Sequence, residues 1–403
     1  MNLSDLLGQG EALARSAADK TAELADRVMD MAGADRLLQP VYCILLHKGK
    51  ERRDITANFD SRLMSLSLTD NRGFESDQVD IVLDDADGQL DLPPRGGIIS
   101  VQLGWKGRPL IDKGSYTVDE VEHSGAPDIL TIRARATDLR AGMATKREKS
   151  WHKTTVGKVV GEIAKANGLT PAVPDWLARR PVAHMDQTSE SDANLLTRLA
   201  GQHDAVATVK AGRLIFCKAG DAESVTGKPF PKVVITRASG DQHRFAVADR
   251  NAYTAVKAYW HDLDKAAKGE VVVDANTKFE RRAGVTKRGK PTKRKKLTPV
   301  QMAAMEPSSA NVKVLRHIYA SETTAIQAAK AAWEKIQRGV AEFSITLAHG
   351  RPELFPELPA RVEGFKPSID GCDWIVSRVC HTLDDNGLIT RIELEMKLED
   401  VAG

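Results

Sequence analysis

Two stretches of the chain alternate between apolar and polar residues with a period of two. In the later stretch one face carries Leu388, Ile392, Leu394, Met396 and Leu398, and the other carries Arg391, Glu393, Glu395 and Lys397. The earlier stretch, 115–136, has the same rhythm. Such alternation is typical of strands with one buried face. Turns rich in Gly, Asp and Asn separate the strands in each stretch, which predicts two antiparallel hairpins.

The two predicted hairpins also match position by position. A shift of 258 residues aligns the following pairs: Tyr116 with Trp374, Val118 with Val376, Val121 with Val379, His123 with His381, Leu130 with Leu388, and Arg133 with Arg391. The triplets Gly104-Trp105-Lys106 and Gly364-Phe365-Lys366 align with a shift of 260, so a small indel separates them from the rest. Two unrelated hairpins are one interpretation. We favour a duplicated β-domain, because aromatic, histidine and glycine positions agree together with the spacing.

The remaining pattern predicts a mainly β chain with an α/β insertion. Residues 1–38 read as an Ala-rich helical extension, and 39–148 as a first β-barrel domain. Its expected strands are 41–47, 63–69, 78–83, 98–105, 115–123 and 129–136. The acidic stretch 84–88 is interpreted as a plain turn, since an EF-hand frame there would need Leu83 and Pro94 as ligands.

Residues 149–222 are expected to form a small α/β domain between the repeats. Val156, Val159, Val160 and Ile163 have helical spacing, and a second helix with Leu195, Leu196 and Leu199 follows the capping pattern of 189–192. The range 223–403 is then a second β-barrel domain that is interrupted twice. The interruptions are a basic segment, 278–296, interpreted as a mobile surface loop, and a helix over 322–338.

Composition narrows the class of protein. A length of 403 residues predicts two to four domains, and no apolar run reaches transmembrane length, so we expect a soluble protein without a membrane span. The N-terminus lacks a secretory pattern. Cys43, Cys217, Cys372 and Cys380 form no CxxC, which favours free thiols in a reducing compartment. The net charge of +3 says little about partners.

The search for chemistry yields no catalytic, cofactor-binding or metal-ligating residues. The chain has no GxSxG, HExxH, P-loop or zinc-spaced Cys/His set. His123 and His381 share a repeat position, but a metal site would need further ligands, so a structural or interface role is favoured. The basic segment 278–296 could contact phosphates, although Phe279 is its only aromatic residue and no recognition helix accompanies it.

Several stretches resemble the phage late control protein D family, the central hub of contractile tails. They are 82–93, 114–121, 150–157, 184–192, 195–200 and the closing block from Gly364 to Glu395. The resemblance covers roughly residues 40–400 in the same order. It does not extend to 1–38, and it gives the basic segment 278–296 no family motif.

The resemblance implies a structural baseplate hub and not an enzyme. Such a hub is a homotrimer in which two similar β-barrel domains per chain form a ring of six. The ring joins a six-fold tail tube or tube-initiator protein to a three-fold spike protein. The C-terminus of the tape-measure protein and other baseplate proteins are further expected partners. The implied location is the baseplate of a virion tail or tail-like bacteriocin, after synthesis in the bacterial cytoplasm.

Two alternatives remain open at this point. One is a tail-associated cell-wall hydrolase, which loss of muralytic activity on changing one carboxylate would reveal. The other is a nucleic-acid-binding protein that uses 278–296, for which DNA binding would depend steeply on salt.

Overall fold

The computed structural model describes residues 39–397 except for 50, 137–141, 211, 225, 248–252, 263–265, 286–290, 302–310 and 339–340. The expected helical extension, 1–38, lies outside the described residues. The described residues within 40–104 and 108–397 belong to one compact unit. Strands dominate this unit, as the sequence predicts.

The first group of strands, here called the first β set, follows the predicted order. It comprises β1 (Pro40–Lys48), β2 (Glu51–Asp54), β3 (Leu63–Asn71), β4 (Gln78–Asp84), β5 (Ile98–Trp105), β6 (Ile111–Ser124) and β7 (Ile129–Ala136), with a 3-10 turn, η1 (Thr56–Asn58), after β2. The sequence did not predict β2, because its four residues are all polar and exposed. These strands lie in the order β3-β4-β7-β6-β5-β1-β2.

The second β set is assembled from the C-terminal part of the chain. It comprises β13 (Val233–Thr236), η3 (Arg237–Ser239), β14 (Gly240–Val247), β20 (Ala341–Leu347), β21 (Pro359–Glu363), α6 (Pro367–Asp370), β22 (Trp374–Asp384) and β23 (Gly387–Met396). Its strands lie in the order β14-β20-β23-β22-β21-β13. This is the order of the first set with β14 in the place of β3, β20 of β4, β23 of β7, β22 of β6, β21 of β5 and β13 of β1.

The hairpins β6–β7 and β22–β23 share a β-bulge at the equivalent position. The β6–β7 register shifts between Val118 and Glu120, and the β22–β23 register shifts at the equivalent step between Val376 and Arg378. A shared bulge is a specific feature, because each bulge inserts one extra residue at a fixed place in a strand. The register therefore supports an internal repeat of the hairpin.

One part of the predicted alignment is wrong. His123 pairs with Leu130, whereas His381 pairs with Thr390, so the second strands correspond with a shift of 260 and not 258. Leu130 therefore corresponds to Thr390, and Arg133 corresponds to Glu393. The difference arises in the turn: β22 and β23 continue to the pair Asp384–Gly387, where Gly387 has a φ of +103° that glycine adopts freely.

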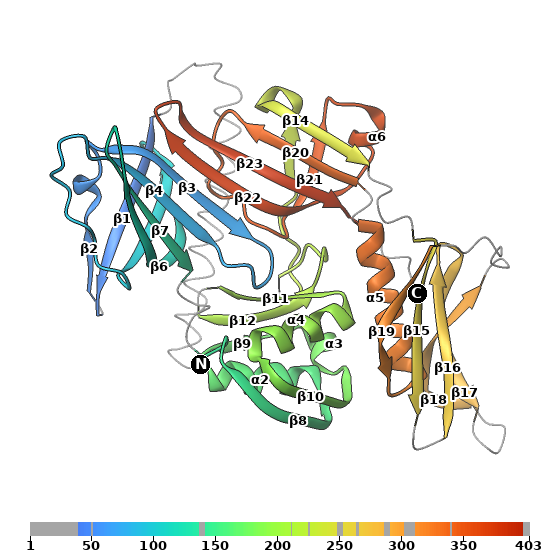
Figure 1. Cartoon of the computed structure of the whole chain (residues 1–403). Helices are drawn as coiled ribbons and strands as arrows, with labels where there is room; N and C mark the ends of the chain where they lie inside the picture. Colours follow the sequence, from blue (N-terminus) through green and yellow to red (C-terminus); the bar gives the residue numbers. More distant parts are fainter. Residues whose placement is uncertain are drawn as a thin grey trace, which may run out of the picture. The chain divides into compact units, whose positions relative to one another are not determined.

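The two sets are joined into one sheet by pairing between β3 and β22 (Figure 1). The blue strand β3 and the red strand β22 come from opposite ends of the described chain, yet they run antiparallel side by side. The result is a 13-stranded sheet. Tyr116 and Trp374 occupy equivalent places in the two sets and are both fully buried.

The insertion between the sets has its own core. It contains β8 (Lys146–Thr155), α2 (Val156–Ala166), β9 (Thr170–Ala172), α3 (Asp175–Ala178), β10 (Pro181–Ser191), α4 (Asp192–His203), β11 (Ala205–Lys210) and β12 (Arg213–Lys218). The side chain of Thr155 caps α2, and α4 is capped by Ser191, the last residue of β10, whose side chain accepts from Asn194 N–H. Val159, Val160, Leu195 and Leu199 face the shared core.

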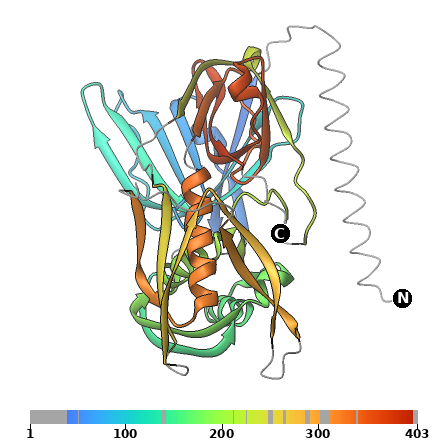
Figure 2. The same cartoon turned by 90° about the vertical axis from the view of Figure 1, so that its right-hand side faces the viewer.

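A second small unit interrupts the second β set. It consists of β15 (Ala255–Asp262), β16 (Ala267–Asp274), β17 (Thr277–Val285), β18 (Pro291–Gln301), β19 (Val312–Tyr319) and α5 (Glu322–Arg338). The orange helix α5 lies against the strands β15 and β16 (Figure 2). Ala325, Ile326 and Ala329 of α5 pack there against Val256 and Val273.

The interpretation of 278–296 as a loop is wrong for its described residues. Strands β17 and β18 pair antiparallel from Thr277–Gln301 to Val285–Pro291. The low apolar content suggested a loop, but the backbone groups of a hairpin satisfy one another whatever the side chains are. Gly289 and the rest of 286–290 lie outside the described residues.

Candidate functional site

The candidate site lies at the junction between β3 and β22, where the two β sets are joined within the chain. Seven residue pairs join the strands, from Asn71–Arg378 to Ser65–Asp384. Leu66 and Leu68 of β3 and Val379 and His381 of β22 share one face and are 0% exposed. Burial of a leucine side chain stabilises by roughly 1.5–3 kcal/mol, so this seam is a strong contact within the chain.

A buried ionic cluster lies at one end of the junction, around Asp70 of β3. Its carboxylate accepts from Lys113 Nζ of β6 at 2.9 Å and from Lys210 Nζ of β11 at 2.8 Å. Lys210 also pairs with Asp77. Lys113 reaches further and donates to the backbone carbonyls of Pro352 and Leu354, both at 3.2 Å. The cluster therefore connects the first β set, the insertion and the second β set.

The charges of this cluster depend on one another. Burial alone would raise the pKa of Asp70, but the ammonium groups of Lys113 and Lys210 outweigh it and lower that pKa to about 2. Asp77 has only one lysine partner, and burial raises its pKa. Burial alone would lower the pKa of Lys210, but its two carboxylates raise it. Asp70 and Lys210 thus hold each other in their charged forms.

A second ionic chain runs beside the first. The guanidinium of Arg72, which follows β3, contacts Glu357 Oε1 through Nε at 2.5 Å and pairs with Glu395 of β23 through Nη1. Glu395 also lies 3.7 Å from Nε of Arg338, the last residue of α5. Arg338 makes a two-pronged pair with Asp204 at the end of α4. Bidentate pairs of this kind add geometric specificity as well as attraction.

The Glu357 carboxylate also binds the insertion directly. Its Oε2 accepts from the backbone N–H of Gly220 at 2.7 Å. Burial raises the pKa of Glu357, and the nearby Arg72 opposes that effect. Removing one member of this second series of ion pairs would leave a buried charge without its partner. These ion pairs therefore fix how the first β set, the insertion and the second β set meet.

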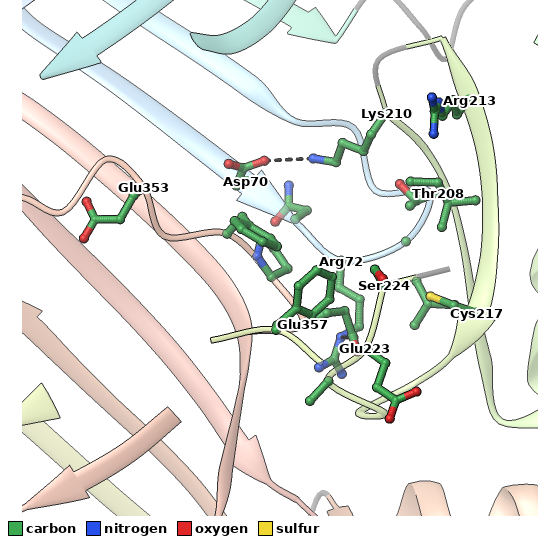
Figure 3. A pocket seen from close by; sticks show the side chains of 18 of the residues that line it. Asp70, Arg72, Thr208, Lys210, Arg213, Cys217, Glu223, Ser224, Glu353 and Glu357 are labelled. Carbon is green, nitrogen blue, oxygen red and sulfur yellow. Dashed lines mark hydrogen bonds and ion pairs between the residues drawn. The ribbon is translucent and has the colours of Figure 1, made fainter. Parts of the chain in front are cut away.

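A cavity of about 560 Å³ opens beside these charges (Figure 3). Its lining comes from the end of β3, the start of β6, strands β11 and β12, and the segment 352–357. In this view Asp70 and Lys210 lie above Arg72 and Glu357. The ionic groups that line the cavity are therefore also the groups that join the parts.

The two histidines with the same repeat position have different surroundings. His381 is fully buried, and its Nδ1 lies 2.9 Å from Thr390 Oγ1. Burial lowers the pKa of His381 to about 3, so it is a neutral structural residue at neutral pH. His123 is 42% exposed at its side chain and lies 3.3 Å from Asp85 Oδ2. Only the equivalence of place, and not that of environment, could be expected from the sequence.

The remaining expectations about single residues can be compared directly. All four cysteines are free thiols, as expected. The 84–88 stretch forms a turn closed by the bond from Gly88 N–H to the Asp85 carbonyl. Within the described residues, no cluster of three or more His, Cys, Asp or Glu is arranged to hold a metal ion. No helix in the described part of the chain has the length and apolarity to cross a membrane.

Sequence reasoning missed the ionic groups of the junction. Asp70, Lys113 and Lys210 lie 43 to 140 positions apart, and no motif links them. One signal was available: Asp70 falls on the apolar face of an alternating strand, two residues after Leu68. A charged residue on such a face needs a buried partner.

Comparison with known proteins points in one direction. The family model described as phage tail baseplate hub (GPD) matches residues 104–387. The "Probable baseplate hub protein" of Escherichia phage 186 is 50% identical over 372 residues, which is 90% of this chain and 95% of that protein. Its counterpart in Escherichia phage P2 is 48% identical over 91% of this chain and 96% of that protein.

Solved structures show the same fold at low sequence identity. A tail protein from Neisseria meningitidis MC58 superposes with a TM-score of 0.59 at 12% identity, over 88% of this chain and 96% of that one. The 43 kDa tail protein of prophage MuSo2 from Shewanella oneidensis gives 0.57 at 14% identity, over 87% and 97%.

Proposed function

This chain belongs to the phage tail baseplate hub (GPD) family, and from that premise we propose that it acts as a homotrimeric adaptor between the tail tube and the spike. It is a component of the phage tail baseplate. The finer proposal is that three copies close into a ring, whose one face meets the six-fold tube and whose other face seats the three-fold spike.

The observation that carries this proposal is the repeated strand order within one chain. A symmetry mismatch between three and six needs a part that presents two equivalent units per subunit. The first and second β sets supply them, because six of their strands correspond in order and the hairpins share a bulge. Three chains then present six similar β sets.

The buried ionic junction supports a rigid adaptor. It ties the first β set, the insertion and the second β set through Asp70, Lys210 and Lys113 on one side and Arg338 and Glu395 on the other. Tube rings form on a template whose units keep a fixed spacing. The junction would provide that spacing, because a buried ion pair tolerates few geometries.

We also infer a structural protein and not an enzyme. The acids and bases of this ionic network whose pKa values are shifted are Asp70, Asp77, Glu357 and Lys210, and each is bound to another charged group or to the backbone. Their proton affinities thus serve the fold.

The boundaries 39–148, 149–222 and 223–403 are proposed for the first β-barrel domain, the insertion and the second β-barrel domain. The C-terminus of the tape-measure protein is proposed to lie in the central channel of the ring.

Purified tail particles provide the test. Quantitative mass spectrometry should find hub and spike chains in a one-to-one ratio, with three copies of each per particle. Tails made without this chain should release spikes that are not joined to tubes. Six hub copies per particle, or normal tube–spike joining without the chain, would exclude the trimeric adaptor.

A further inference from the structure

The repeat inside the chain also specifies how one copy would meet the next. The strand β22 uses two edges. One edge pairs with β23 along its whole length. The other edge first bonds the 357–358 segment, through Val376 N–H to the Leu358 carbonyl at 2.9 Å, and then pairs with β3 from Arg378 to Asp384.

The strand β6 has the same edges but lacks the second partner. One edge pairs with β7. The other bonds the 96–97 segment, through Val118 N–H to the Gly97 carbonyl at 2.8 Å, which is the equivalent of the Val376 bond. Beyond that point, residues 120–124 have no strand on this edge within the described part of the chain.

The strand β14 has the complementary vacancy. It occupies the place of β3 in the second β set and pairs with β20 on one edge. No strand lies on its other edge among the residues that the structure describes. In β3 this same edge holds β22. Unpaired strand edges are templates for pairing with another chain.

Equivalent residues are buried where the edge is paired and uncovered where it is free. Leu68 is 0% exposed in β3, whereas its counterpart in β14, Phe245, is only partly buried. His381 is 0% exposed in β22, whereas His123 in β6 has a side chain 42% exposed. Val247, which occupies the place of Asp70, is 63% exposed. The two free edges thus expose the positions that the internal junction covers.

We propose that β14 of one copy pairs antiparallel with β6 of the next copy, in the register that β3 and β22 use within the chain. Transferring that register places Phe245 opposite His123 of the second copy, as Leu68 lies opposite His381. Val247 then lies opposite Val121, and Arg244 lies opposite Ser124. The proposal deepens the trimeric adaptor and rests on it.

Side-chain chemistry fits this register. Opposed residues share a face of the sheet, so Phe245 and Val247 would pack with Val121 and His123 of the second copy. On the other face, Arg244 would lie diagonal to Glu122, whose side chain is 50% exposed. A basic residue on β14 thereby meets an acidic residue on β6. Because the two edges differ, the contact is head-to-tail, and copies can close into a ring.

Disulfide trapping tests the register. In a background with the four native cysteines replaced by serine, the double variant Arg244→Cys/Ser124→Cys should form disulfides between copies, since opposed strand residues have Cα atoms about 4.5–5.5 Å apart. The positive control is Ser67→Cys/Thr382→Cys, the equivalent pair within one chain. The register control is Arg244→Cys/His123→Cys, whose side chains point to opposite faces of the sheet in the proposed register and would oppose each other only after a one-residue slip.

The expected result is covalent dimers and trimers of Arg244→Cys/Ser124→Cys on a non-reducing gel, at least about tenfold above Arg244→Cys/His123→Cys, because the strand period is two. Links that stop at two chains would indicate a two-fold contact and overturn the proposal. A trimer by light scattering that does not cross-link would overturn the register and leave the adaptor standing. A chain that stays monomeric even with the spike protein would overturn both.

Discussion

The Asp70 carboxylate is the residue on which the junction depends most. Asp70→Asn would leave the ammonium group of Lys113, whose side chain is 5% exposed, buried without its counter-charge, and would remove one of the two carboxylate partners of Lys210. Breaking a buried ion pair costs about 3–5 kcal/mol, so we expect a loss of that size in the free energy of unfolding, measured with urea at pH 7.

Asp87→Asn is the matched control. Asp87 also binds a basic residue, Arg62, through both carboxylate oxygens, but its side chain is 54% exposed. Exposed pairs contribute little, so this variant should unfold close to the parent. Equal losses in the two variants would contradict the special role of the buried cluster.

Acid should weaken the fold through His381. Its pKa is about 3 in the folded chain and near 6.5 when unfolded, so between these values the unfolded chain binds more protons. The contribution of neutral His381 to the free energy of unfolding is fully present above pH 6.5 and is lost as pH falls toward 3. The loss is about 2–3 kcal/mol near pH 4.5, at 1.36 kcal/mol for each unit. His203, with a pKa lowered to about 4 by burial, acts in the same direction.

His381→Gln removes the titrating group and keeps a polar side chain next to Thr390. Urea unfolding at several pH values from 7 to 4.5 should therefore show a shallower decline for this variant than for the parent. An unchanged slope would show that His381 does not carry the acid sensitivity.

For single residues, the sequence predicts which positions of the two hairpins are equivalent better than it predicts which side chains contact one another. The shift of 258 residues correctly pairs Tyr116 with Trp374 and His123 with His381, because the bulge occurs at the same step in both strands. It does not reveal that Asp70 meets Lys210, since that contact depends on how the insertion packs on the first β set.

Among the elements, the contact between α4 and α5 depends on Arg338 and Asp204. Arg338→Met would leave the buried Asp204 carboxylate without its guanidinium partner, at a cost of about 3–5 kcal/mol. Asp204→Asn in addition should add less than its separate effect, with a coupling of about 1 kcal/mol or more in a double-mutant cycle. Urea unfolding of the parent, the two single variants and the double variant gives the four unfolding free energies of the cycle.

The control is Arg179→Met. Arg179, the residue after α3, pairs with Asp175 of α3 at 2.8 Å, but both side chains are well exposed, at 79% and 88%. This variant should leave the unfolding free energy nearly unchanged. Strict additivity of Arg338→Met and Asp204→Asn would mean that the buried pair does not couple the helices.

The edge of β14 makes a separate prediction about assembly. Val247→Lys places a charge on a residue that is 63% exposed in the free chain, so folding should be preserved. Charged residues block edge pairing, and the variant should lose the trimer. Val314→Lys is the matched control, because Val314 of β19 is 49% exposed and lies outside the proposed contact. Size-exclusion chromatography with light scattering distinguishes the two.

Most of the predicted strands and helices were found because their apolar periodicity is strong. The strands 98–105 and 129–136 and the helix over 322–338 have the expected bounds. The failures have a common cause: β2 and the hairpin of β17 and β18 are held by backbone pairing with few apolar side chains, so hydrophobic pattern gives no signal for them.

For the whole molecule, the alternation of the strands predicts a mainly β fold, and the resemblance predicts the family. Neither predicts that β3 and β22 merge the two β sets into one sheet. That pairing joins residues about 310 positions apart, and the local pattern of apolar and polar residues carries no information about contacts at such a separation. The same pairing is what makes the contact between copies specific, since it provides the template for β14 and β6.

The absolute mass of the purified protein, by light scattering, tests the central claim most directly. We expect three times the 44.0 kDa chain mass, either for the protein alone or when it is co-expressed with the spike protein. A protein that remains a 44.0 kDa monomer in both preparations would contradict the ring of three and the strand pairing that builds it.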